Sequence, residues 1–203
     1  MQQTQHILVS AAGLFLKLGI RSVSMDDVAR AVGISKKTLY QHVENKSDLV
    51  TQVLRSHLEE IEARVRSIRA GATGNAIDEM IAICQSVVVD MRTMHPSTLH
   101  DLKKYYPESW RLLEQHKNEF VYGVVQANLE RGIDEGLYRT EIDRDIIARI
   151  YMNTIDDIVD LVQFPSTEYD FEKVYLEYIR YHLNGIATPE GARVLQTRKL
   201  RPE

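Results

Sequence analysis

The chain has 203 residues and a formal net charge of −4 at pH 7, with 44% hydrophobic and 27% charged residues. This length allows one large or two small domains with a buried core, and few glycines and prolines among many aliphatic, Glu and Lys residues favour an all-α fold. A single cysteine excludes an intrachain disulfide and no apolar run reaches membrane-spanning length, so we expect a cytoplasmic protein without a membrane partner.

The charge is unevenly distributed along the chain. Residues 1–50 contain six Lys/Arg and four Asp/Glu, which gives +2 and leaves −6 for residues 51–203. A modestly basic segment beside an acidic remainder is typical of a protein that presents one face to DNA.

Apolar residues at helical spacing predict a first helix over residues 5–17, and Gly19 ends it. Its apolar stripe would cover the segment that follows. The stripe consists of Ile7, Leu8, Ala11, Leu14, Phe15 and Leu18.

The next 25 residues have the pattern of two short helices joined by a tight turn. Ser24 occupies an N-cap position and Asp27 the matching capping-box position. Gly33 lies where the chain must turn, because glycine accepts a left-handed backbone without steric cost. Ser35 caps the second helix. The pattern predicts a helix-turn-helix, whose second helix lies in the major groove of DNA.

The DNA-facing side of the second helix follows from its 100° rotation per residue. When Leu39 and Val43 point inward, Lys37 and Gln41 lie on the opposite side. Lys, Gln and Thr side chains can contact base edges, whereas Tyr, His and the next Lys suit the phosphate backbone. A helical hairpin with a solvated polar face is the alternative. The predicted DNA-binding residues are Ser24, Ser35, Lys36, Lys37, Thr38, Tyr40, Gln41, His42 and Lys46.

About 45 residues in this region resemble the N-terminal domain of the TetR/AcrR family of bacterial transcription regulators. The resemblance rests on the order of a first helix, Gly19, a hydroxyl residue, the pattern A-x-x-x-G-[IV]-S, and then T-L-Y-x-H before a Lys-containing helix. Lys37 departs from the glycine, and Val43 from the phenylalanine, that many members have. The resemblance implies phosphate contacts by Ser24, Tyr40, His42 and Lys46, and base contacts by Lys36, Lys37, Thr38 and Gln41.

Further amphipathic segments predict about nine to ten helices in all. They begin with a long helix from residue 45 or 47 to about 69 and continue with segments 75–93, 97–104, 107 to about 131, 144–164 and 169–186, then a short helix capped by Thr188. A basic tail over residues 197–203 is expected to fray. We expect a DNA-binding domain over residues 1–48 and an effector-binding and dimerisation domain over residues 49–203.

The last two long helices have apolar stripes broad enough to face a second surface besides their own core. In the resembled family, these helices form an intersubunit four-helix bundle, which implies a homodimer on a palindromic operator in double-stranded DNA. The expected interface residues are Ile147, Tyr151, Ile155, Ile158, Val174, Tyr178 and His182.

The resemblance also implies that a small-molecule effector binds among the middle helices and weakens DNA binding. Soft and aromatic residues there favour a lipophilic compound, although each is also an ordinary core residue. The sequence does not identify the effector. The expected pocket residues are Cys84, Met91, Met94, Trp110, His116, Tyr122, Met152 and Asn153.

One acidic pattern points to a different class of protein. Asp156, Asp157 and Asp160 form a DDxxD sequence, which in all-α diphosphate enzymes binds Mg²⁺. No second acidic motif or basic diphosphate clamp accompanies it, and the acids also suit a solvated helix edge. A non-enzymatic helical adaptor is a further alternative. The histidine spacing provides no metal site, so we expect no metal, no cofactor and no enzymatic activity.

Overall fold

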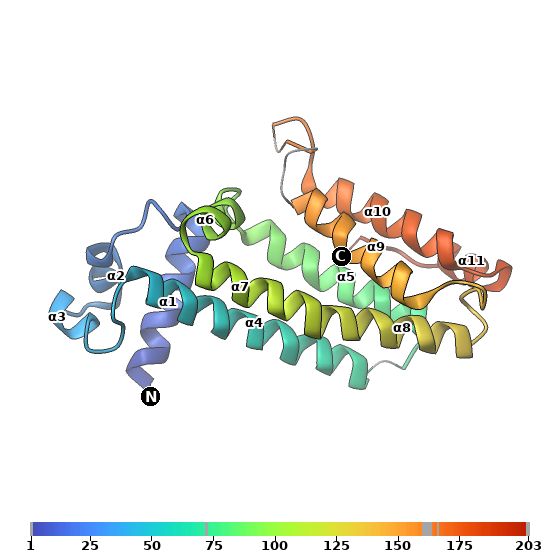
Figure 1. Cartoon of the computed structure of the whole chain (residues 1–203), viewed down its shortest axis with the longest axis horizontal. Helices are drawn as coiled ribbons and strands as arrows, with labels where there is room; N and C mark the ends of the chain where they lie inside the picture. The colour runs from blue at the N-terminus through green and yellow to red at the C-terminus, as the bar shows by residue number, and fades with distance from the viewer. Residues whose placement is uncertain (1, 72, 160–163, 166, 202–203) are drawn as a thin grey trace. The chain divides into compact units, whose positions relative to one another are not determined.

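A computed structural model describes residues 2–71, 73–159, 164–165 and 167–201 and confirms the all-α fold (Figure 1). None of the helices in these ranges is long and apolar enough to cross a membrane. The helices are α1 (Gln2–Leu18), α2 (Met25–Val32), α3 (Lys36–Leu39), α4 (Lys46–Gly71), α5 (Ala76–Thr93), α6 (Thr98–Tyr105), α7 (Pro107–His116), the π-helical turn η1 (Lys117–Val121), α8 (Tyr122–Asp134), α9 (Arg144–Val159), α10 (Phe171–Ile186) and α11 (Pro189–Gln196).

The chain divides into two compact units. The first comprises Met1–Ile61 with Thr93–His116, and the second Glu62–Arg92 with Lys117–Glu203. The first unit therefore includes α6 and α7, which lie far beyond residue 48 in the sequence. The division into a DNA-binding domain over residues 1–48 and an effector-binding and dimerisation domain over residues 49–203 concerns function, and it stays a prediction.

The core of the first unit forms around the apolar stripe of α1. Ile7 and Ala11 are fully buried, as is Leu39 of α3. Leu102 of α6 and Tyr106, which precedes α7, belong to the same buried cluster. The helix-turn-helix and α6 thus share one core, and burial of these apolar side chains holds them together.

The core of the second unit lies among α5, α8, α9 and α10 (Figure 1). Cys84 is fully buried there, and burial raises the pKa of its thiol to about 11. A thiol with such a pKa is protonated and unreactive near neutral pH. Its buried neighbours in the cluster include Met80, Leu129, Tyr175 and Ile179.

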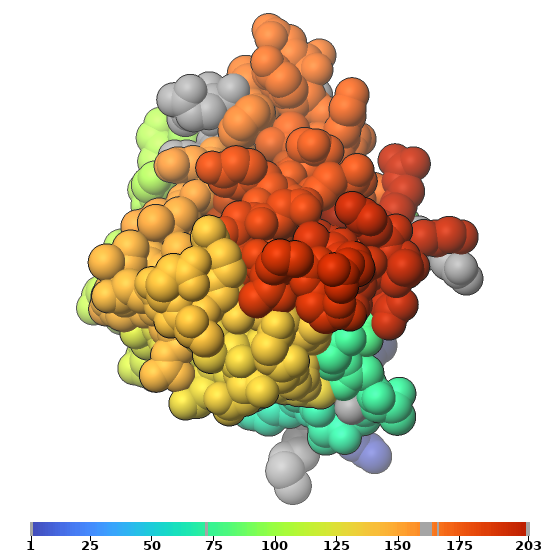
Figure 2. Space-filling model, turned by 90° about the vertical axis from the view of Figure 1, so that its right-hand side faces the viewer, coloured from blue at the N-terminus to red at the C-terminus, as the bar shows by residue number. Residues whose placement is uncertain are grey.

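The turn after α8 packs directly against the start of α11, and both lie on the face seen in Figure 2. Thr188, the N-cap of α11, donates its backbone N–H to the Leu137 carbonyl at 2.9 Å. A Cβ added at Gly191 would lie 2.1 Å from the same carbonyl oxygen, so only glycine fits. The predicted cap at Thr188 is confirmed.

Residues 107–134 are helical throughout, as expected, but the π-helical turn η1 separates α7 from α8. One prediction about the chain is wrong. The tail does not fray over residues 197–201, because Leu200 is buried in the core of the second unit and Arg198 pairs with Asp78 at 2.6 Å. Single side chains in the tail thus anchor it, although its composition is polar.

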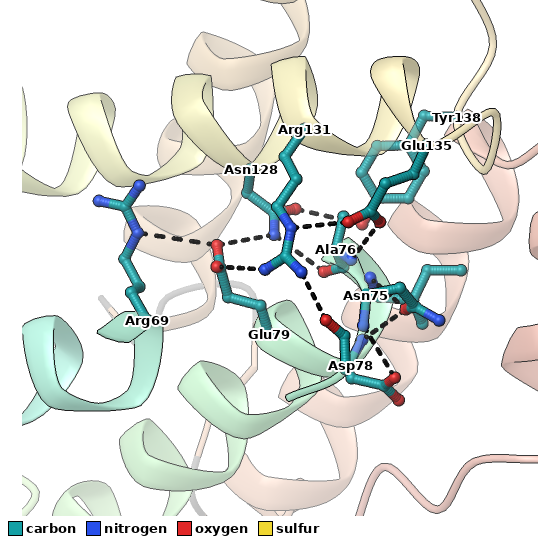
Figure 3. A network of polar contacts seen from close by, with 11 residues as sticks. Arg69, Asn75, Ala76, Asp78, Glu79, Asn128, Arg131, Glu135 and Tyr138 are labelled. Atoms are coloured by element: carbon teal, nitrogen blue, oxygen red, sulfur yellow. Dashed lines mark hydrogen bonds and ion pairs between the residues drawn. The ribbon is translucent and has the colours of Figure 1, made fainter. Parts of the chain in front are cut away.

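A buried polar network joins α5 and α8 in the second unit (Figure 3). Glu79, only 4% exposed, accepts hydrogen bonds from Asn128 at 3.1 Å and Arg131 at 3.0 Å. Tyr138 donates its hydroxyl to the Asn128 side chain at 3.1 Å. Arg69 of α4 lies 3.7 Å from the same Glu79 carboxylate. Each buried polar side chain of this network thereby has a partner, as a low-dielectric interior requires.

Candidate nucleic-acid interface

The first helix of the predicted helix-turn-helix begins with the expected capping box. The Asp27 N–H donates to Ser24 Oγ at 3.2 Å, and the Ser24 N–H donates to the Asp27 carboxylate at 2.9 Å. The Ser24 hydroxyl also donates to the Asp27 carboxylate at 2.6 Å. This bond, and after it the bond from the Ser24 N–H, holds the pKa of Asp27 below its usual value. Gly33 ends α2 with φ +75°, so the predicted left-handed turn is confirmed.

The second helix is short and rigidly anchored. Ser35 Oγ accepts the Thr38 N–H at 3.0 Å, and regular α-helix ends at Leu39. The Val43 N–H still donates to the Leu39 carbonyl at 3.2 Å, which keeps the two predicted anchors one turn apart. Leu39 is fully buried and Val43 is 3% exposed. The outward face of this turn is therefore fixed by the core beneath it.

The predicted base-contacting residues differ in whether their side chains have a hydrogen-bond or ion-pair partner within the chain. Lys37 and Gln41 are exposed and form no hydrogen bond to another described side chain. Lys36 pairs with Asp26 of α2 at 2.9 Å, which raises the pKa of the lysine. The Thr38 hydroxyl lies 2.8 Å from that of Ser35.

Two predicted phosphate contacts are tied to residues that sequence analysis did not identify. His42 Nδ1 lies 3.0 Å from the hydroxyl of Thr4, at the start of α1. Lys46 Nζ donates to the Arg21 carbonyl at 3.2 Å. Partial burial lowers the pKa of Lys46, since a charged ammonium loses solvation there. No local pattern would reveal these pairs, because their members are separated by 38 and 25 residues.

We refer to the nine predicted residues, which lie at the N-caps of α2 and α3, on α3, in the turn after it and at the start of α4, as the DNA-binding face. Tyr40, 42% exposed, and the N-caps Ser24 and Ser35, also exposed, complete it. The face carries exposed amide, hydroxyl and ammonium groups, which suit phosphates and base edges.

The predicted pocket residues are divided between the two compact units. Met94, Trp110 and His116 belong to the first unit, whereas Cys84, Met91, Tyr122, Met152 and Asn153 belong to the second. A groove of about 680 Å³ in the second unit is lined by none of them. Its aromatic and apolar lining comes from Ile158, Phe164, Tyr169, Val174, Tyr178 and Tyr181.

The predicted dimer residues are divided between the interior and the surface. Tyr151, Ile158 and His182 are buried within the chain itself. The others, Ile147, Ile155, Val174 and Tyr178, are half-buried. Three large apolar residues that sequence analysis did not select are more exposed, namely Ile146 at 55%, Ile150 at 52% and Tyr181 at 77%.

The acidic pattern on α9 is only partly described. Asp156 pairs with Lys117 of η1 at 2.6 Å, and Asp157 is exposed. Asp160 lies outside the described residues. The carboxylate of Asp156 is thus engaged by a lysine within the chain, as expected of a helix-edge acid.

The sequence of the DNA-binding face is similar to that of known regulatory proteins. Residues 7–53, which include all nine predicted DNA-binding residues, match the family model described as bacterial regulatory proteins, tetR family. Over 92% of each chain, the protein is 27% identical to the HTH-type transcriptional repressor KstR2 of Rhodococcus jostii (strain RHA1).

Two solved structures share the fold. The reduced form of NemR from E. coli matches with a TM-score of 0.75 and 13% identity, covering 93% of this chain and 98% of that one. The ketosteroid transcriptional regulator KstR2 of Mycobacterium tuberculosis matches with a TM-score of 0.60 and 22% identity, covering 91% and 95%. These likenesses extend over both compact units.

Proposed function

We propose that this chain, which belongs to the tetR family of bacterial regulatory proteins, is a repressor that binds a palindromic operator as a homodimer and is released by a small-molecule effector. That it is a DNA-binding regulator follows from its family and its repressor relatives. The observation that carries the proposal is the exposed polar turn fixed over buried Leu39 and Val43.

On this proposal α3 enters the major groove. Lys37 and Gln41 contact base edges directly, and Lys36 and Thr38 join them when they exchange their internal partners for DNA. Phosphate contacts come from four further predicted residues and set the register without reading sequence. These residues are Ser24, Tyr40, His42 and Lys46, while Ser35 caps α3.

Dimerisation uses the exposed side of α9 and α10. Ile146 and Ile150 lie one turn apart on α9, and Tyr181 is the most exposed large hydrophobic residue on α10. Exposed apolar rows of this kind favour association with a second apolar surface. A two-fold dimer would present two recognition turns to half-sites about 34–36 Å apart, so the operator is an imperfect palindrome.

The effector is proposed to be lipophilic. The interior of the second unit combines apolar residues with the soft side chains of Cys84 and Met152, both of which were predicted to line a pocket. A relative described as a ketosteroid regulator supports an apolar class of ligand. Effector binding would favour a conformation with lower DNA affinity, which requires different affinities of the effector for the two conformations.

Selection of binding sites from random duplex DNA tests the proposal. The purified full chain is used at near-physiological salt, with the double variant Lys37→Ala/Gln41→Ala as the matched control. We expect wild-type protein to enrich a palindrome and the control to lose that enrichment. A folded wild-type protein that enriches no sequence would contradict the proposal.

A further inference from the structure

Residues 95–97, which precede α6, pack closely against the turn between α1 and α2. Gly19 adopts φ +78°, and a Cβ there would lie 2.8 Å from Ser97 Oγ and 3.2 Å from His95 Nδ1. Asp101 of α6 is only 5% exposed, and its Oδ2 accepts the Ser97 hydroxyl at 3.3 Å. All of these residues belong to the first compact unit.

Arg21, in the same turn, is held at three points. Its backbone N–H donates to Asp101 Oδ2 at 3.2 Å. Its guanidinium lies 4.4 Å from the ring centre of Tyr105 and donates to the Tyr105 hydroxyl at 2.9 Å. Its carbonyl accepts the hydrogen bond from Lys46 Nζ at 3.2 Å. One residue thus connects a buried carboxylate to a lysine of the DNA-binding face.

The bond to the Arg21 carbonyl orients the Lys46 ammonium. An ammonium has three N–H donors, and this bond uses one, so two remain to reach a phosphate. Any shift of the Arg21 backbone would move the acceptor that fixes Lys46. The α1–α2 turn also leads directly into the Ser24 cap, so the same shift would reach a second predicted phosphate contact.

We propose that Asp101 is a positioning residue for DNA binding, which fixes the Arg21 backbone and thereby places Lys46 and the Ser24 cap for phosphate contact. This inference rests on the proposed phosphate contacts. Asp101 acts through Arg21 and does not touch DNA itself.

Electrostatics alone predicts the opposite sign. A carboxylate near a DNA-binding face repels phosphates, so its removal would tighten binding if the charge were all that mattered. Positioning instead predicts weaker binding. Asp101→Ala and Asp101→Asn remove the same charge, but only asparagine keeps an oxygen that can accept the Arg21 N–H.

The test is a double-mutant cycle on the operator that wild-type protein selects. Dissociation constants are measured by fluorescence anisotropy from low to moderate salt for wild type, Asp101→Ala, Lys46→Ala and the double variant. We expect Asp101→Ala and Lys46→Ala each to weaken binding about tenfold on every sequence, and Lys46→Ala to lower the salt slope by about one unit. The double variant should bind less than tenfold more weakly than Lys46→Ala, because the part of the Asp101 effect that passes through Lys46 is already lost and only the part that passes through the Ser24 cap remains.

Two further variants separate positioning from structure and charge. Asp101→Asn should restore part of the affinity that Asp101→Ala loses. Glu108→Gln removes a charge from an exposed position in the same unit and should leave affinity within about twofold of wild type. Circular dichroism and thermal melting check that each variant is folded. If Asp101→Ala does not fold, the near-isosteric Asp101→Asn carries the test and should bind more weakly than wild type.

Several outcomes would overturn the inference. The first is that the folded Asp101 variants bind the operator as tightly as wild type or more tightly. The second is that Asp101→Ala weakens binding by the same factor in the Lys46→Ala background as in wild type. In both cases wild-type protein still selects its operator, so the proposed function stands. If wild-type protein selects no site, the proposed function fails and this inference fails with it.

Discussion

The polar network around Glu79 and the polar residues of the helix-turn-helix differ in whether their side chains find hydrogen-bond partners within the chain. Around Glu79, arginine, asparagine and tyrosine side chains bond to one another inside the second unit. On the helix-turn-helix, Lys37 and Gln41 are exposed on a turn whose underside is buried. Exposed polar side chains without a partner on a fixed turn therefore favour recognition, whereas a buried network whose members bond to one another favours a structural role.

The largest expected effect concerns the buried network. Glu79→Ala would leave Arg131 and Asn128 without their buried acceptor, so we expect the free energy of unfolding to fall by about 3–5 kcal/mol. Urea denaturation followed by circular dichroism measures it. Glu130→Ala, which breaks an exposed pair with Arg144, is the control and should cost less than about 1 kcal/mol. Equal effects of the two variants would contradict the contrast between the regions.

His182 provides a second test of the interior. It is 7% exposed, its Nε2 has no hydrogen-bond partner among the described residues, and burial lowers its pKa to about 4. Between pH 6.5 and 4 the His182 imidazole binds a proton in the unfolded chain but stays neutral in the folded chain. Stability is therefore fully present above about pH 6.5 and falls by about 3 kcal/mol as the pH decreases to 4.

Urea denaturation at several pH values measures this dependence. Between pH 6.5 and 5 the slope reports the contribution of His182. Carboxylates whose pKa is lowered in the folded chain, such as Asp78 and Glu172, take up protons below pH 5 even when the chain is unfolded. His182→Leu should flatten the slope there, and His6→Leu, at an exposed position, should not. An unchanged slope in His182→Leu would show that another group is responsible.

On the recognition turn, the expected effect is on specificity. Gln41→Ala should reduce discrimination at one base of each half-site by about 1–3 kcal/mol if the contact is bidentate, with little change in stability. Competition between operator variants measures the discrimination. Gln196→Ala, also exposed but in the second unit, is the control. If Gln41→Ala keeps the full sequence preference, the assignment of the reading face is wrong.

The smallest effect concerns the exposed pair between Lys36 and Asp26. Asp26→Asn frees the lysine and removes a negative charge from the face, so DNA affinity should rise about two- to fivefold at low salt. The gain should fade as salt increases, and Asp134→Asn, at an exposed position on α8, should show none. Weaker binding by Asp26→Asn would mean that the pair orients Lys36 for DNA instead of withholding it.

The sequence alone determined the features whose causes are local. Ser24 with Asp27, the left-handed Gly33, and the Thr188 cap each depend on residues within one helical turn, so their chemistry is visible in a few letters. The periodicity that put Leu39 and Val43 inward likewise determined that Lys37 and Gln41 face outward. The resemblance over about 45 residues contributed the prediction of the family and of the phosphate contacts.

Only the tertiary structure decided the features that join distant residues. Arg21 and Asp101 are 80 residues apart, and Glu79 and Arg131 are separated by 52. Leu200 lies in a tail whose polar composition predicts fraying, yet a single buried leucine and two arginine pairs hold it. The predicted dimer residues Tyr151 and His182 show the same limit, because periodicity finds an apolar stripe but not which surface covers it. Burial and pairing depend on the neighbours that folding brings together, and no local pattern encodes them.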